Sequence, residues 1–123
     1  MNPDELRRRT QAFAVEVIRL CRVLSRTTEG RTVAGQLIRC SASVAANYRA
    51  VCRARSRKEF ISKIGTVVEE ADETQFWLEL LVKLGLLTPD KVEFTLNEAT
   101  ELVAIFTASR RTAQRRHASS RPR

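Results

Sequence analysis

The sequence predicts an all-α fold, an antiparallel up-down-up-down bundle of four helices. Capping residues and helix breakers divide the chain into four long segments, and the apolar residues of each segment recur with the helical period of about 3.6 residues. No segment shows the convincing alternation of period two that a half-buried strand requires. Four amphipathic helices joined by short loops bury their apolar faces most simply in such a bundle.

The first helix is recognised by its first turn, and the second by the glycine that precedes it. Pro3 is tolerated at the first helical position, and Asp4 and Glu5 suit the positive end of the helix dipole. We expect Gly30 to end this helix and the second helix to begin at about Arg31. Together with the two that follow, the expected helices cover about residues 4–27, 31–54, 57–84 and 89–113.

The last two helices have clear boundary signals. Ser56 opens a Ser-Arg-Lys-Glu capping box before the third helix, and Gly85 closes that helix. Thr88 followed by Pro89 opens the fourth helix. Residues 114–123 contain no apolar face that could pack against the bundle, so we expect them to form a flexible basic tail after a bundle domain of residues 1–113.

The apolar residues of the third helix form two stripes, whereas each other helix has one. Together the two stripes cover more of the helix than one face of a monomeric bundle can bury. Either this end of the helix is unusually enclosed, or the second stripe contacts another subunit, which we favour. The acidic residues on this stripe would then pair with arginines of the second helix of a neighbouring protomer. The expected oligomer interface comprises Glu69, Glu73, Phe76, Trp77, Leu80, Leu81 and Leu84.

The charge of this 123-residue chain is unevenly distributed. Its formal net charge is +8. Residues 31–63 carry eight basic groups and one acidic group, whereas residues 64–101 carry two basic and nine acidic groups. The last residues, 110–123, add six arginines and no acid. This distribution favours a polyanionic partner together with charge pairing inside or between subunits.

Arginines also share faces opposite the apolar stripes of the first two helices. Such a face is often only a solubilising surface, but two of them followed by a basic tail favour phosphate binding, because arginine makes bidentate contacts with phosphate oxygens. Tyr48 and Trp77 lie on apolar stripes, so we expect contacts with the backbone rather than the bases. The candidate nucleic-acid-binding residues are Arg8, Arg19, Arg22, Arg26, Arg39, Arg49, Arg53, Arg55, Arg57, Lys58, Arg110, Arg111, Arg115 and Arg116.

Catalytic and metal-binding patterns are absent from the sequence. The single histidine, His117, lies in the basic tail, and the three cysteines lack paired metal-ligand spacing. We therefore expect no catalytic residues, no metal and no cofactor. An enzyme with an intersubunit site at Asn47, Tyr48 and Glu73 is the least favoured alternative.

Cysteine usage and hydropathy indicate the compartment. An odd number of cysteines without framework spacing suits reduced thiols, and no apolar run follows Met1. The longest uncharged stretch, Cys40 to Tyr48, is much shorter than the ~20 residues that a membrane span needs. We expect a cytoplasmic protein that does not bind membranes.

The stretch from Ile38 to Leu87 resembles the family of 23S rRNA intervening-sequence proteins. "IRCSASVAANYRAVCRARSRKEFISK" and then "EEADETQFWLELLVKLGLL" follow its pattern of a small-residue segment with Asn, a basic segment reaching Ser-x-x-Glu-Phe, and an acidic helix ending Trp-Leu-x-Leu-Leu before Gly. Ala46 and Ala50-Val51 depart from it without threatening the fold. The matching positions are Arg39, Ser43, Val44, Asn47, Tyr48, Arg53, Ser56, Glu59, Phe60, Glu69, Glu70, Glu73, Trp77, Leu78, Leu81 and Gly85.

The resemblance implies a four-helix protomer that assembles into a ring, commonly a pentamer, with no established catalytic activity. A more distant likeness is to the accessory protein of diversity-generating retroelements, a basic pentamer that binds nucleic acid and a reverse transcriptase. We therefore expect a non-enzymatic, homo-oligomeric nucleic-acid-binding or scaffold protein. The alternative is an adaptor whose basic surface docks an acidic protein, such as a reverse-transcriptase-like enzyme.

Overall fold

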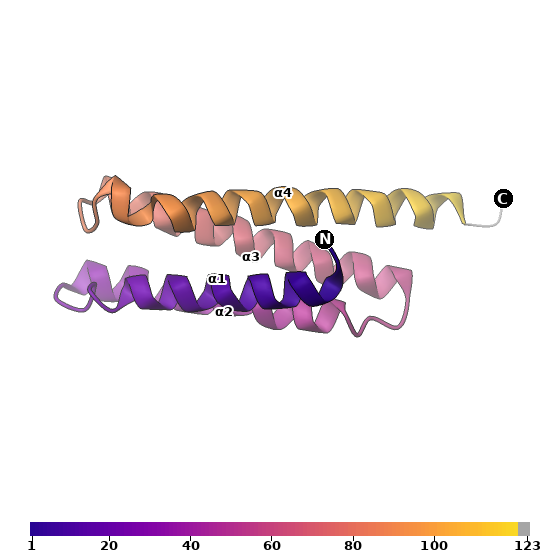
Figure 1. The fold of residues 1–123 in the computed structure, drawn as a ribbon, viewed down its shortest axis with the longest axis horizontal. Helices are drawn as coiled ribbons and strands as arrows, with labels where there is room; N and C mark the ends of the chain where they lie inside the picture. Colours follow the sequence, from indigo (N-terminus) through magenta and orange to yellow (C-terminus); the bar gives the residue numbers. More distant parts are fainter. Residues whose placement is uncertain (121–123) are drawn as a thin grey trace.

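The computed structural model describes residues 1–120, which are all-helical with no strand. The helices are α1 (Pro3–Cys21), α2 (Thr28–Val51), α3 (Arg57–Lys83) and α4 (Pro89–Ser119) (Figure 1). The all-α prediction is confirmed.

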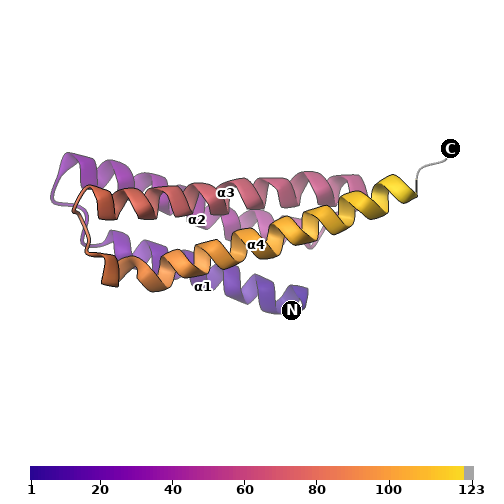
Figure 2. The same cartoon turned by 90° about the horizontal axis from the view of Figure 1, so that it is seen from above.

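The chain reverses direction at each of its three loops (Figure 1). The α1–α2 and α3–α4 loops lie at one end of the molecule, and the α2–α3 loop lies with both termini at the other. Helices that follow each other along the chain pack extensively, whereas α1 and α4 contact each other much less. α1 and α4 diverge toward the end that carries the termini (Figure 2).

Side-chain caps hold the starts of three helices. Asn2, Thr27 and Ser56 each accept a hydrogen bond from the backbone N–H three residues later, at 2.9, 3.0 and 3.0 Å. These bonds satisfy N–H groups that have no partner within the helix. At the end of α3, Gly85 adopts φ +71°, the left-handed conformation in which glycine has no Cβ penalty. The boundaries predicted at Ser56 and Gly85 are therefore confirmed.

The boundary predicted at Gly30 is wrong. α1 ends at Cys21 rather than near residue 27, and Thr27 caps a second helix that begins at Thr28, so Gly30 lies in the first turn of α2. Glycine is needed there for a close approach: an ideal Cβ at Gly30 would lie 2.2 Å from the carbonyl oxygen of Leu24. α2 also ends earlier than expected, at Val51 rather than near residue 54.

The fourth helix is longer than predicted. α4 continues to Ser119, so residues 114–119 of the expected flexible tail are helical. Arg57 of α3 stabilises this extension, because its Nη1 donates to the carbonyl oxygen of Arg116 at 2.9 Å and to Ser120 Oγ at 3.3 Å. Residues 121–123 of the expected tail lie outside the described residues.

The core lies along the centre of the bundle and receives side chains from all four helices. Its fully buried members include Val17, Leu37, Leu78 and Phe106. Leu81 is also fully buried, so its place in the expected oligomer interface is wrong: it packs inside the protomer. The same stripe of α3 does leave apolar surface outside the core, as described below.

Candidate nucleic-acid interface

One end of the bundle is strongly basic. The start of α1, the end of α2, the α2–α3 loop, the start of α3 and the end of α4 all lie there (Figure 1). The carboxylates in these segments are Asp4, Glu5 and Glu59. We call this surface the basic end, and its exposed cationic residues are Arg7, Arg8, Arg49, Arg53, Arg55, Arg57, Lys58, Arg110, Arg111, Arg115 and Arg116.

A groove between α1 and α2 gathers part of this charge. It has a volume of about 460 Å³ and is lined by Asp4, Arg7, Arg8, Gln11, Arg49 and Arg53. Asp4 pairs with Arg7, whereas the other three arginines have no ion-pair partner among residues 1–120. Arg8, Arg49 and Arg53 were predicted from the sequence, whereas Arg7 and Gln11 were not. Arg7 and Gln11 are four residues apart, which places them on one face of α1, and this spacing could have identified them.

The end of α4 adds a second row of arginines beside the start of α3. The guanidinium of Arg110 lies against the α3 backbone at Gly65, where an ideal Cβ would be 3.2 Å from Arg110 Nε. Arg111, Arg115 and Arg116 are exposed along the same end of the helix.

The remaining predicted residues do not reach the basic end. Arg19, Arg22 and Arg26 lie at or beyond the end of α1, near the opposite end of the bundle. Arg19 also pairs with Glu16 at 3.5 Å. These three residues therefore form a separate cationic group.

Arg39 belongs to a polar cluster between α2 and α3. It pairs with Glu73, and with Glu70 at 3.1 Å. Glu73 also accepts a hydrogen bond from Trp77 Nε1 at 3.1 Å. Within the protomer, Glu73 therefore already pairs with an arginine of α2, and its pairing with a neighbouring protomer stays a prediction. With two carboxylates beside it, Arg39 is a poor phosphate ligand.

An apolar patch lies next to that cluster. The side chains of Phe76 and Leu84 are 54% and 42% exposed, and Trp77 and Leu80 are partly buried. Phe76 and Trp77 stack edge to face with ring centroids 5.0 Å apart. Glu69 is exposed on the same helix. We call Phe76, Trp77, Leu80 and Leu84 the α3 patch.

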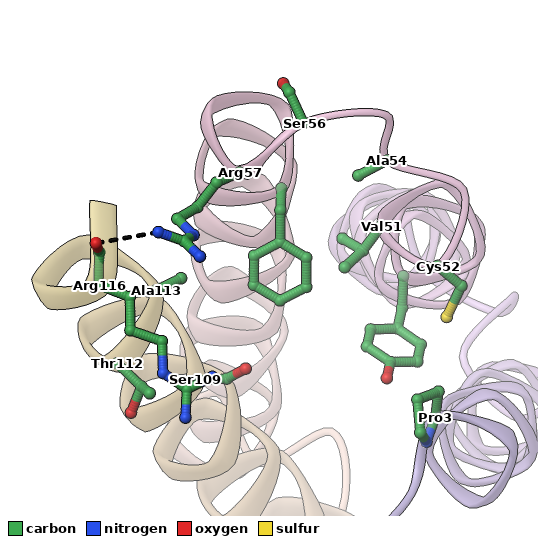
Figure 3. Close-up of a pocket in the computed structure, with 12 residues that line it drawn as sticks. Pro3, Val51, Cys52, Ala54, Ser56, Arg57, Ser109, Thr112, Ala113 and Arg116 are labelled. Atoms are coloured by element: carbon green, nitrogen blue, oxygen red, sulfur yellow. Dashed lines mark hydrogen bonds between the residues drawn. The ribbon is translucent and has the colours of Figure 1, made fainter. Parts of the chain in front are cut away.

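A cleft opens at the basic end (Figure 3), on the side where α4 diverges from α1 (Figure 2). Its volume is about 780 Å³. Burial raises the pKa of the Tyr48 phenol at its floor. The cleft is lined by Pro3, Tyr48, Val51, Cys52, Ala54, Ser56, Arg57, Phe60, Ser109, Thr112, Ala113 and Arg116.

The cysteines have different surroundings. Cys21 and Cys40 are buried, and burial raises the pKa of both thiols, that of Cys21 from 9.0 to about 11. Cys52 is exposed. Within residues 1–120, no group of three or more His, Cys, Asp or Glu residues is placed to hold a metal ion. None of the described helices combines the length and hydropathy needed to cross a membrane.

These features define a small helical-bundle protein with a basic end and an apolar patch on α3. Residues 5–108 match the family model of the 23S rRNA-intervening sequence protein, and the chain belongs to that family. A similar solved structure is the crystal structure of a protein with unknown function from the S23 ribosomal protein family of Bacteroides thetaiotaomicron VPI-5482. Its TM-score is 0.83 and its sequence identity 29%, over 90% of this chain and 99% of that chain. None of the curated proteins matches this chain.

Proposed function

We propose that this protein is a non-enzymatic, homo-oligomeric nucleic-acid-binding scaffold that contacts the phosphate backbone through its basic end. The observation that carries the proposal is the convergence of exposed arginines from all four helices on one end, with few carboxylates among them. Backbone contacts of this kind supply affinity that does not depend on sequence.

The α1–α2 groove supports this proposal most directly. Arg8, Arg49 and Arg53 line it together, and no carboxylate among residues 1–120 pairs with them. Because a guanidinium presents its donors in a fixed fork that matches a phosphate, several unpaired arginines along one groove suit a chain of phosphates. Arg39, whose charge is balanced locally, is left out of the proposed surface.

Oligomerisation would multiply this surface. The α3 patch is the apolar surface through which we propose that protomers associate, in a ring of antiparallel four-helix bundles such as the pentamer that the family resemblance implies. Each protomer offers a modest basic end, and simultaneous engagement of several ends by one nucleic acid raises the overall affinity without new contacts. We place this assembly in the cytoplasm.

The test is binding of a fluorescent RNA or DNA oligonucleotide as a function of salt. We expect micromolar or tighter binding at low salt, and a log–log slope of about −0.7 to −0.9 per phosphate contact. The double variant R49E/R53E should weaken binding by more than about tenfold and flatten the slope, because two phosphate contacts are lost.

The matched control is R22E/R26E, which makes the same charge change near the opposite end of the bundle. It should change binding much less than R49E/R53E does. Equal losses in the two variants would show that net charge alone matters. If the unmodified protein fails to bind any oligonucleotide at low salt, the basic end instead suits an acidic protein partner, and the proposal is wrong.

A further inference from the structure

The cleft at the basic end has the dimensions of a ligand site. Its volume of about 780 Å³ lies within the range of roughly 300–1,000 Å³ that is typical of small-molecule pockets. Pro3 and Cys52 form one wall, and Thr112, Ala113 and Arg116 form the opposite one (Figure 3).

The floor of the cleft is apolar and aromatic. Phe60 is partly exposed there, and Tyr48, which is only 5% exposed, lies beside it together with Val51 and Ala54. The Tyr48 ring is held in place by Phe106, with ring centroids 5.0 Å apart. A rigid aromatic floor suits a flat, weakly polar group such as a nucleobase, because every base has a face that stacks on aromatic side chains.

The rim of the cleft is cationic, and none of its lining residues carries a carboxylate. Arg57 uses Nη1 to bind Arg116 O and Ser120 Oγ, which leaves its Nε and Nη2 without a protein partner among residues 1–120. The Arg116 side chain runs back along α4 toward Ser109 (Figure 3) and has no ion pair within the same residues. The free donors and the hydroxyl groups of Ser109 and Thr112 suit a phosphate.

The cleft and the proposed backbone groove are lined by neighbouring residues at the start of α1 and the end of α2. Pro3 and Cys52 line the cleft, and their sequence neighbours Asp4 and Arg53 line the groove. A nucleic-acid strand bound in the groove would therefore lie close to the cleft.

We propose that the cleft binds one unpaired nucleotide of a bound nucleic acid, with its base against Phe60 on the apolar floor and its phosphate at Arg57 and Arg116. This inference rests on the proposed function and adds a substrate preference to it. A base in a duplex would have to be unpaired and unstacked to enter, so single-stranded nucleic acid should bind more tightly than a blunt duplex.

Thiol protection tests the site in the unmodified protein. Cys52 is exposed and lines the cleft, whereas Cys21 and Cys40 are buried and, with raised pKa values, react slowly. A saturating single-stranded 12-mer should slow modification of Cys52 by a thiol-reactive dye at least about fivefold. A blunt duplex of the same sequence, bound to saturation, should slow it much less. Equal protection by the two would overturn the inference.

A cleft-filling variant provides the second test. We choose A113W, whose indole would occupy part of the cleft, and A108W on an exposed face of α4 as the control. A113W should bind the single strand roughly five- to tenfold more weakly and the duplex unchanged, because a base loses its stacking surface. A108W should bind both as before. Circular dichroism melts check that both variants fold.

The two proposals fail differently. If neither the single strand nor the duplex binds the unmodified protein, the proposed function itself is wrong. If both bind equally and A113W changes neither, backbone binding stands and the nucleotide site is wrong. If the cleft instead binds an apolar side chain of a partner protein, this second result is also expected, and the nucleotide site is wrong.

Discussion

At the scale of single residues, two glycines of α2 lie only five positions apart but have opposite surroundings. A Cβ at Gly30 would lie 2.2 Å from the Leu24 carbonyl oxygen, whereas a Cβ at Gly35 would meet nothing within 4 Å. The first position therefore requires glycine, and the second has no steric reason for it.

We predict that G30A and G35A change stability in opposite directions. G30A should lower the free energy of unfolding by about 1–3 kcal/mol, because the α1–α2 loop must shift to avoid the clash. G35A should raise it by up to about 1 kcal/mol, because alanine is the better helix former. Urea unfolding followed by circular dichroism, at one fixed protein concentration, measures both. An unchanged free energy of unfolding in G30A would contradict the close approach of the Leu24 carbonyl oxygen to Gly30.

The burial of individual residues was predictable only in part. Tyr48 was expected on an apolar stripe of the second helix and is buried in the core. Leu81 was assigned to a subunit contact because it lies on the second stripe of α3, yet it is buried too. A helical wheel gives the direction of a side chain but not the width of the neighbouring helices, so residues at the border between core and surface cannot be assigned from it.

At the scale of helices, a polar contact links α1 with α4. Arg9 binds Glu98 through two hydrogen bonds, Nε to Oε2 at 2.7 Å and Nη2 to Oε1 at 2.6 Å, and lies 3.3 Å from Glu101. The side chains of Arg9 and Glu98 are only 22% and 19% exposed. Bidentate geometry and partial burial set this pair apart from an ordinary surface ion pair.

We predict that R9A lowers the free energy of unfolding by about 1–2 kcal/mol, since Glu98 would be left half-buried without its partner. R7A, which removes an exposed pair with Asp4, should change it by less than about 0.5 kcal/mol. Thermal or urea unfolding compares the two variants. If R9A and R7A lower the free energy of unfolding equally, the Arg9–Glu98 pair stabilises the protein no more than an exposed ion pair does.

The number and type of helices followed from periodicity and capping signals, but some boundaries did not. Gly30 looked like a helix terminator because a single sequence cannot show a close approach to a distant carbonyl. The end of α4 looked mobile because its sequence lacks an apolar face. The bond from Arg57 that caps it comes from another helix, so it depends on how α3 and α4 are aligned.

At the scale of the whole molecule, the candidate site was predictable by residue type but not by position. The sequence showed that arginines share one face of each of the first two helices, but not which of these arginines lie at the same end of the bundle. Because α1 and α2 run in opposite directions, Arg8 lies beside Arg49 and Arg53, whereas Arg22 and Arg26 lie far from them. The local neutralisation of Arg39 by Glu70 and Glu73 required the alignment of α2 with α3, which no pattern in one helix records.

The α3 patch leads to a prediction about assembly. F76D should weaken a homo-oligomer, because an unpaired carboxylate would be buried at the subunit contact. V15D is the matched control, since Val15 is 45% exposed on α1, which does not pack against α3. Light scattering with circular dichroism reports size and folding together. A stable 14 kDa monomer for the unmodified protein would end this idea.

The limited contact between α1 and α4 has a consequence for how the chain folds. Nearly all the helix packing joins neighbours in sequence, α1 with α2, α2 with α3 and α3 with α4. Each hairpin can therefore form after closing only a short loop, which costs little entropy, and the mean sequence separation of contacting residues stays low. Such chains fold rapidly, and the α1–α4 contact, which spans nearly the whole sequence, is the step that pays the largest loop-closure cost. The protomer should thus become compact before its first and last helices meet.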